Sequence, residues 1–236
     1  MTCILVAHLA DEVIIAADKR VTQIAENGAR VPCGDNEEKL VRTEAGVITG
    51  AGSLAMLDPV KSLVRDRGFD SPDVVLKWIL NIRKSFSEAH ANSPRLAADL
   101  AETSWMFTYP TVVNDQPVTR FVYFHQHLST ESLCVLTEGR AMCFPGGFSM
   151  EQAQALQAKL QAVVTEALES LPASQVRQTV VSGMLTLMSE TAEISETVSS
   201  TCDIAVVNGR QVDIALSVTE SNDVPEFIPM AHVAAS

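Results

Sequence analysis

The sequence predicts an α+β fold. Segments rich in β-branched and aliphatic residues occur in the first 52 residues, in the middle of the chain and near its end. Two helical segments separate each group of strands from the next, an order that is typical of layered α+β domains. The chain has 236 residues, 47% of them hydrophobic, which is enough for one large domain with a full core.

Charge and composition exclude several functional classes. The net charge of −12 disfavours nucleic acid and anionic membranes as partners, because both attract basic surfaces. No signal peptide is evident, and no apolar run approaches the ~18 residues of a transmembrane helix. The cysteines form no Cys-x-x-Cys pattern, so we expect buried free thiols in a reducing cytoplasm. They are Cys3, Cys33, Cys134, Cys143 and Cys202.

The first 52 residues predict two hairpins joined by a loop. Residues 2–22 contain two aliphatic arms around a short turn, the composition of paired strands. Residues 24–38 contain turn signals such as Asn27-Gly28, so we expect a loop there. Residues 39–42 and 47–51 predict the second hairpin.

Two helices are predicted next. Gly52 precedes the first, in which Pro59 predicts a break and Asp58 a cap for the restart. Ser71-Pro72-Asp73 is a strong start signal for the second helix. Residues 89–102 predict a short helix and a loop. The apolar residues of the second helix recur at helical spacing and predict a core face, formed by Val74, Val75, Trp78, Ile79, Ile82 and Phe86.

The middle of the chain predicts three strands, at residues 105–108, 119–126 and 132–136. His125 and His127 would lie on one face of a strand, where they could form a pair of metal ligands. No third ligand of suitable spacing accompanies them. We therefore expect no metal and no cofactor.

Two helices and a hairpin are predicted for the last third. Ser149 and Gln152 form a capping-box pattern at the start of a long helix, and a second helix follows it. Residues 202–218 predict a hairpin around Asn208-Gly209. The predicted division of the chain is a single domain over residues 1–219 and a loosely attached tail over residues 220–236.

Thr2 is the first candidate for chemistry, because only Met1 precedes it. Removal of an initiator methionine before a small residue is the usual processing rule, so the mature chain would begin with Thr2. A terminal threonine carries a hydroxyl and an amine, and an amine with an ordinary pKa of about 7.7–8.0 can act as a base near neutral pH. Holding nucleophile and base on one residue removes most of the entropy cost of assembling them.

Three motifs follow Thr2 in order. Asp18-Lys19-Arg20-Val21-Thr22 ends the second predicted strand, Lys39 begins the third, and Gly50-Ala51-Gly52-Ser53 closes the fourth. Together with Thr2, these residues resemble the pattern of the proteasome β-subunit family of N-terminal-nucleophile (Ntn) hydrolases, of the bacterial proteasome homologue type. The resemblance extends over roughly residues 2–218, with a longer loop before Lys39 and one residue fewer between Lys39 and Ala51-Gly52.

This resemblance implies a fold and a set of roles. The fold is a four-layer α-β-β-α sandwich of two antiparallel sheets with flanking helices. Thr2 would be the nucleophile, and the Gly52 N–H would stabilise the oxyanion. Lys39, paired with Asp18, would hold the Thr2 amine in its neutral form. The supporting residues would be Arg20, Glu196 and Ser199, and the substrate-binding residues Val21, Thr22, Gly50 and Leu54.

The same residues also have plainer interpretations. Lys39 would be a solvated lysine on an edge strand, and Gly52 an ordinary strand-to-helix turn. Glu196 and Ser199 match an Asp-x-x-Ser-Gly motif with Glu in place of Asp, or they lie in a solvated loop. Gly146-Gly147 stands where the family has Gly-Ser-Gly, so the auxiliary serine of the family is expected to be absent.

The sequence predicts a threonine-type hydrolase that cleaves peptide bonds through an acyl ester on Thr2. Val21, Leu54 and Gly50 would shape a pocket for apolar substrate side chains. The alternatives are a non-catalytic ring or assembly subunit, and an amide-bond transferase in which an amine resolves the ester. The expected partners are a peptide or protein substrate, further copies of the chain in a ring or ring-like homo-oligomer, and a regulator or unfoldase.

Overall fold

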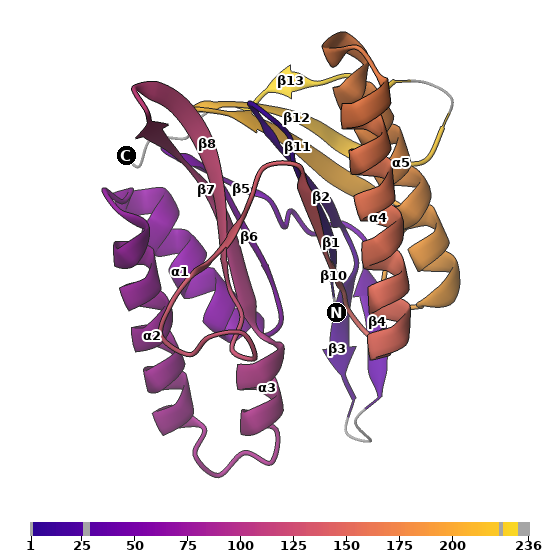
Figure 1. Ribbon diagram of the computed structural model, residues 1–236. Coiled ribbons are helices and arrows are strands. Elements are labelled where there is room, and N and C mark those ends of the chain that lie inside the picture. The colour runs from indigo at the N-terminus through magenta and orange to yellow at the C-terminus, as the bar shows by residue number, and fades with distance from the viewer. Residues whose placement is uncertain (1, 26–28, 222–223, 231–236) are drawn as a thin grey trace.

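The computed structural model describes residues 2–25, 29–221 and 224–230, which form a mixed α+β fold (Figure 1). Within these ranges the chain has antiparallel sheets of six, five and two strands, together with five helices. The α+β class expected from the sequence is confirmed. Measured by length and hydropathy, no helix in the described ranges could cross a membrane.

The six-stranded sheet places the N-terminal strands among its inner strands. In spatial order its strands are β10 (Arg140–Pro145), β1 (Cys3–His8), β2 (Val13–Asp18), β11 (Cys202–Asn208), β12 (Gln211–Val218) and β13 (Ile228–Pro229). Every residue of β1 and β2 is buried, because apolar clusters cover both faces of the sheet. Burial on both faces explains why these strands are nearly continuous apolar runs rather than alternating patterns.

The five-stranded sheet carries the other wall of the site. Its strands in spatial order are β5 (Val41–Thr43), β6 (Gly46–Ala51), β7 (Ser104–Val113), β8 (Gln116–Phe124) and β9 (Cys134–Leu136). A two-residue turn joins β7 to β8, and both of its residues are left-handed, Asn114 with φ 50° and Asp115 with φ 61°. Two left-handed residues suit the tight hairpin turns that match the twist of paired strands.

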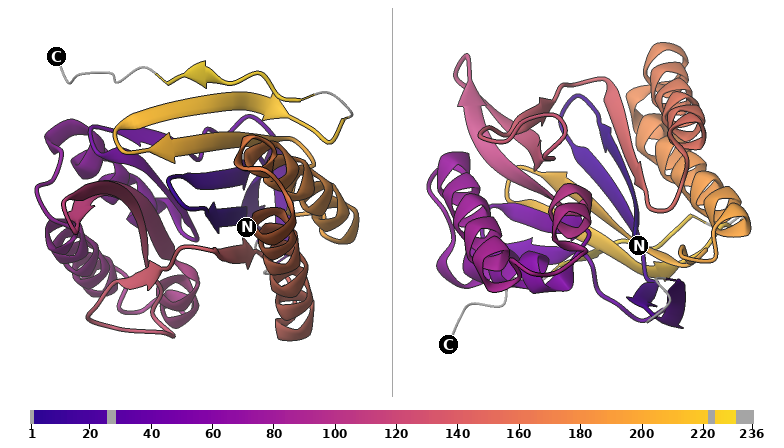
Figure 2. Two further views of the ribbon diagram at one scale, coloured as in Figure 1. Left: turned by 45° about the horizontal axis from the view of Figure 1, so that its top comes forward. Right: turned by 90° about the horizontal axis from the view of Figure 1, so that it is seen from below.

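The helices divide between the two large sheets. Helices α4 (Met150–Ser170) and α5 (Ala173–Ile194) share an apolar cluster with β1, β2 and β11. Helices α1 (Leu54–Arg67) and α2 (Pro72–Ala89) share another with β6, β7 and β8, and a third cluster joins the two sheets. Figure 2 shows the two helix pairs far apart, with strands between them. The short helix α3 (Leu96–Glu102) precedes β7.

Several predicted helix ends are confirmed. The Ser71 hydroxyl accepts a hydrogen bond from the Asp73 N–H, and Pro72 is the first residue of α2. Both hydrogen bonds of the capping box between Ser149 and Gln152 are present at the start of α4. These local side-chain bonds satisfy N–H groups that have no partner within the helix.

Residues 24–38 are more ordered than a simple loop. β3 (Val21–Ile24) and β4 (Arg30–Gly34) pair as a separate two-stranded hairpin, while the first hairpin ends at Asp18 rather than Thr22. The predicted turn at Asn27-Gly28 lies outside the described residues. The hairpin escaped prediction because its strands are short and largely exposed, and so carry little apolar pattern.

The predicted break at Pro59 is wrong. Helix α1 runs unbroken from Leu54 to Arg67 with Pro59 inside it. Its buried residues lie on both sides of the proline, with Met56 and Leu57 before it and Val60 after it. This packing outweighs the hydrogen bond that the proline cannot donate.

The sequence also missed strands β10 and β13. β13 joins part of the predicted loose tail to β12, where the Met230 N–H donates to the Val212 carbonyl over 2.8 Å. The cysteines are all free, but only Cys3 and Cys202 are buried as expected: Cys134 and Cys143 are partly exposed, and Cys33 is exposed.

The strand assignment of the histidine pair is wrong. β8 ends at Phe124, so His125 and His127 do not share a strand face, and their ring centroids lie 5.4 Å apart. The described part of the chain holds no group of three or more His, Cys, Asp or Glu side chains placed to bind a metal.

Candidate active site

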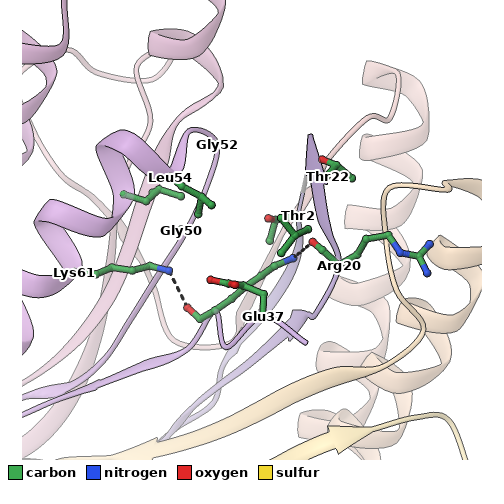
Figure 3. Close-up of a pocket in the computed structure, with 11 residues that line it drawn as sticks. Thr2, Arg20, Thr22, Glu37, Gly50, Gly52, Leu54 and Lys61 are labelled. Atoms are coloured by element: carbon green, nitrogen blue, oxygen red, sulfur yellow. Dashed lines mark hydrogen bonds between the residues drawn. The ribbon is translucent and has the colours of Figure 1, made fainter. Parts of the chain in front are cut away.

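A pocket lies where the start of β1, the end of β2 and the β6–α1 junction meet (Figure 3). It holds about 430 Å³ of empty space, part of it open to solvent. Eight of the residues predicted for the site line it, together with three that were not predicted. The lining residues are Thr2, Arg20, Val21, Thr22, Glu37, Lys39, Gly50, Gly52, Leu54, Leu57 and Lys61.

Asp18 lies behind this pocket, at the end of β2, and its side chain is fully buried. One carboxylate oxygen accepts hydrogen bonds from the Cys3 N–H at 2.7 Å and the Lys39 ammonium at 2.7 Å. The other accepts from the N–H groups of Arg20 at 3.0 Å and Ser199 at 3.3 Å. Four donors from four separate segments therefore satisfy this carboxylate in a place that water does not reach.

Lys39 is the buried cation of the site. Its ammonium donates to Asp18 and, over 2.8 Å, to the carbonyl of Arg20, and its side chain is 7% exposed. Burial lowers the pKa of Lys39, and the negative charge of Asp18 opposes that effect. The solvated edge-strand interpretation of Lys39 is therefore wrong: a buried ammonium with an ion-pair partner can act electrostatically on neighbouring groups.

Thr2 lines the pocket at the start of β1. Its carbonyl accepts a hydrogen bond of 2.9 Å from the Gly146 N–H, and the next residue, Cys3, is bound through its N–H to Asp18. Backbone bonds on both sides thus fix the Thr2 main chain. Thr2 and Lys39 both line the pocket, and Figure 3 shows the Thr2 side chain there, across from Leu54 and Lys61.

Two glycines bring backbone close to the pocket. A Cβ on Gly50 would lie 2.5 Å from the Ser104 carbonyl oxygen and 2.6 Å from a Leu57 methyl carbon. Gly52 has φ +117°, and a Cβ there would lie 2.5 Å from the Thr103 Cα. Neither position tolerates a side chain, so the β6–α1 junction presents bare main chain beside the pocket.

Arg20 clamps the segments around the site. Its guanidinium donates two hydrogen bonds of 2.7 Å to the Asp35 carboxylate and others to the carbonyls of Glu196, at 2.9 Å, and Val198, at 3.0 Å. The hydrogen bond with Asp35 raises the pKa of Arg20, and it lowers the pKa of Asp35. Arg20 thereby ties the β3–β4 hairpin to the segment that precedes β11.

The two members of the Glu196–Ser199 motif take different positions. The Glu196 side chain is exposed, and the Glu196 carbonyl accepts a hydrogen bond from the Arg20 guanidinium. Ser199 is buried, and its N–H donates to Asp18. Glutamate is one methylene longer than the aspartate of the family pattern, and its carboxylate lies out in solvent.

Hydroxyl groups from another segment lie near Gly146. The Thr197 hydroxyl donates to the Gly146 carbonyl over 3.5 Å and lies 2.8 Å from the Ser195 hydroxyl. Thr197 was not predicted as a site residue. Because Gly146 also binds the Thr2 carbonyl, this contact connects the segment before β11 to the nucleophile candidate.

Sequence reasoning missed Asp35, Glu37 and Lys61 as members of this region. Lys61 had a detectable signal, since it follows Leu57 by four residues and so lies on the buried face of α1. Asp35 and Glu37 lie in a segment with no periodic pattern, and their positions depend on contacts with residues distant in sequence.

The fold places the chain in a structural class. It shares its fold with Ntn-hydrolase-related proteins of the proteasome type, at low sequence identity. No protein-family model matches the sequence, and no curated protein matches it significantly. The likeness therefore concerns the fold alone.

Three solved structures illustrate this likeness in fold. The Anbu Gly-1 mutant from Hyphomicrobium sp. strain MC1 has a TM-score of 0.55 and 16% identity, covering 94% of this chain and 88% of that one. Anbu (ancestral beta-subunit) from Yersinia bercovieri has a TM-score of 0.57 and 12% identity, covering 98% and 89%. Eukaryotic HslV from Trypanosoma brucei has a TM-score of 0.50 and 14% identity, covering 87% and 99%.

Proposed function

We propose that this chain is a threonine-type Ntn hydrolase that cleaves peptide bonds after Met1 has been removed. The observation that carries the proposal is the buried Asp18–Lys39 ion pair in contact with the pocket that Thr2 and Gly52 line. The three apolar clusters also support the four-layer sandwich implied by the resemblance, with residues 1–219 as one domain.

The proposed reaction begins at Thr2. Its free amine takes the proton of its hydroxyl as the oxygen attacks the substrate carbonyl, and the positive charge of Lys39 keeps that amine neutral beforehand. Main-chain N–H at Gly52 stabilises the oxyanion. The tetrahedral intermediate collapses to an acyl ester on Thr2, and the departing amine takes the proton. Water, activated by the Thr2 amine, then hydrolyses the ester.

A non-catalytic assembly subunit is the second candidate. The exposed side chain of Glu196 and the absence of a serine at Gly146-Gly147 favour it, because the resemblance places supporting polar groups at both positions. An amide-bond transferase would use the same nucleophile, with an amine in place of water in the last step.

The test begins with an intact mass of the purified protein from its native host, which should lack one methionine. Short fluorogenic peptides should then be cleaved by the wild type, slowly by Thr2→Ser and not by Thr2→Ala, because only alanine removes the nucleophilic oxygen. Equal turnover by a homogeneous Thr2→Ala sample would refute the mechanism. A retained Met1, with no turnover in any variant, would support the assembly subunit. Added amines that divert product to a new amide would identify the transferase.

A further inference from the structure

We propose that Lys61 makes this pocket select substrates that place a carboxylate beside the scissile bond. The inference rests on the proposed function, because it assumes that the pocket next to Thr2 receives a substrate side chain. It assigns the substrate an acidic side chain there, in place of the apolar one that Val21, Leu54 and Gly50 suggested from sequence.

Lys61 reaches the pocket from helix α1. Its side chain is buried, at 7% exposure for the residue, and its ammonium donates one hydrogen bond, of 3.2 Å, to the Lys39 carbonyl. Figure 3 shows the Lys61 side chain extending from its helix into the pocket, with Thr2 on the other side. An ammonium has three donors, so two remain for a ligand.

Lys61 has no carboxylate within ion-pair distance among the described residues. The other two cations of the pocket differ in this respect, because Lys39 is paired with Asp18 and Arg20 with Asp35. Burial lowers the pKa of Lys61, and the nearby charges of Asp58 and Glu37 oppose that effect. An unpaired buried ammonium gains most when a ligand supplies the missing negative charge.

Glu37 is the competing group. Its carboxylate lines the same pocket and would repel an acidic substrate. Glu37 is, however, only partly buried, so water screens its charge more than that of Lys61. The deeper cation therefore determines the preference, and Glu37 weakens it.

The main experiment compares peptides that differ only in the residue before the scissile bond. Glutamate and glutamine have nearly the same shape, so the ratio of kcat/KM for the Glu peptide to that for the Gln peptide isolates the charge. The wild-type ratio should be about 10 or more, as expected for a charged hydrogen bond in a poorly hydrated site. Lys61→Met should bring the ratio to about 1, and Glu37→Gln should raise it.

The matched control is Lys77→Met, which removes an exposed lysine of α2 and should keep the wild-type ratio. A wild-type ratio of 1 or below, with the peptides cleaved, would overturn the inference and leave the proposed function standing. The wild-type ratio, together with the ratio for Glu37→Gln, tests the role of Lys61 even if Lys61→Met does not fold.

A binding arm covers the case in which nothing is cleaved. Titration calorimetry of the Glu and Gln peptides against Thr2→Ala needs no turnover. Tighter binding of the Glu peptide, with the difference lost in Thr2→Ala/Lys61→Met, supports the acidic pocket while the hydrolase proposal fails. Equal binding of both peptides, or no binding of either, refutes the proposal that Lys61 selects a substrate carboxylate.

Discussion

Asp18 and Lys39 form a buried ion pair that joins several segments of the fold and lies beside the proposed nucleophile. Asp18 joins the main chain of β1, the β2–β3 junction and the segment before β11. Among the described residues, Lys39 is the one side chain that donates a hydrogen bond to Asp18. Three backbone donors orient the carboxylate, so its position does not depend on Lys39 alone. The charge of the Asp18 carboxylate, in contrast, is balanced by Lys39.

Replacing Lys39 should therefore damage stability and activity together. Lys39→Ala leaves a buried carboxylate without its cation, which should lower the free energy of unfolding by about 3 kcal/mol and kcat/KM by orders of magnitude. Lys39→Arg should not restore activity, since a planar guanidinium cannot replace a compact ammonium between Asp18 and the Arg20 carbonyl. Urea unfolding and peptide kinetics measure both effects. Wild-type rates in either variant would show that Lys39 has no part in catalysis.

The pH dependence of activity should be bell-shaped. The Thr2 amine must be neutral, so kcat/KM should rise as pH passes the pKa of that amine. Lys39 must also stay charged. Burial lowers its pKa from 10.5, so activity should fall again at the alkaline end of the profile, as rising pH removes the proton of Lys39. A profile of kcat/KM between pH 5 and pH 10, in buffers of equal ionic strength, tests both limbs. A rate that is flat across this range would contradict the proposed roles.

Among the elements, helix α1 forms one wall of the pocket and has a proline, Pro59, in its interior. Pro59 cannot donate a hydrogen bond inside the helix, and the packing of Met56, Leu57 and Val60 holds the helix together. Since α1 also carries Leu57 and Lys61 into the pocket, its local geometry bears on the shape of that pocket.

Pro59→Ala should stabilise the protein. Alanine restores the missing donor and removes the clash of the proline ring, so the free energy of unfolding should rise by about 1–3 kcal/mol. Urea denaturation of the variant and the wild type measures the difference. Ser62→Ala, a change at a half-buried position of the same helix that leaves the main-chain bonds intact, is a suitable control. A Pro59→Ala protein that is less stable than the wild type would mean that α1 depends on a bend at Pro59.

Some of the helices and strands could be predicted from the sequence, and others could not. Long apolar or well-capped elements such as β1, β2, α2 and α4 were predictable, because their signals are local. The β3–β4 hairpin was not, because its strands are short and largely exposed. Strand β10 was not, since it pairs with β1, which is distant in sequence. Thr2, Lys39 and Gly52 were found by their order along the chain, whereas Lys61 and Asp35 become visible only when the chain is folded.

For the whole molecule, we expect assembly into a homo-oligomer larger than a dimer. Exposed apolar residues occur on the β3–β4 hairpin, at Ile24 and Val31, and at Leu54 beside the pocket. The net charge of −12 makes copies repel one another, so raised salt should strengthen the assembly. Light scattering after size exclusion, at micromolar protein and at low and high salt, measures this. A single peak at 25.5 kDa in both conditions would exclude it.

The contacts of Asp18 also determine when the site is completed during synthesis of the chain. β1 and β2 are made first, but β2 pairs with β11, and Asp18 lies opposite Cys202 in that pairing. Ser199, which donates to Asp18, immediately precedes β11. A nascent chain on the ribosome therefore carries Thr2 for most of its synthesis without the neighbours that complete the site. Translation order by itself would delay the proposed activity until Ser199 and β11 have been made.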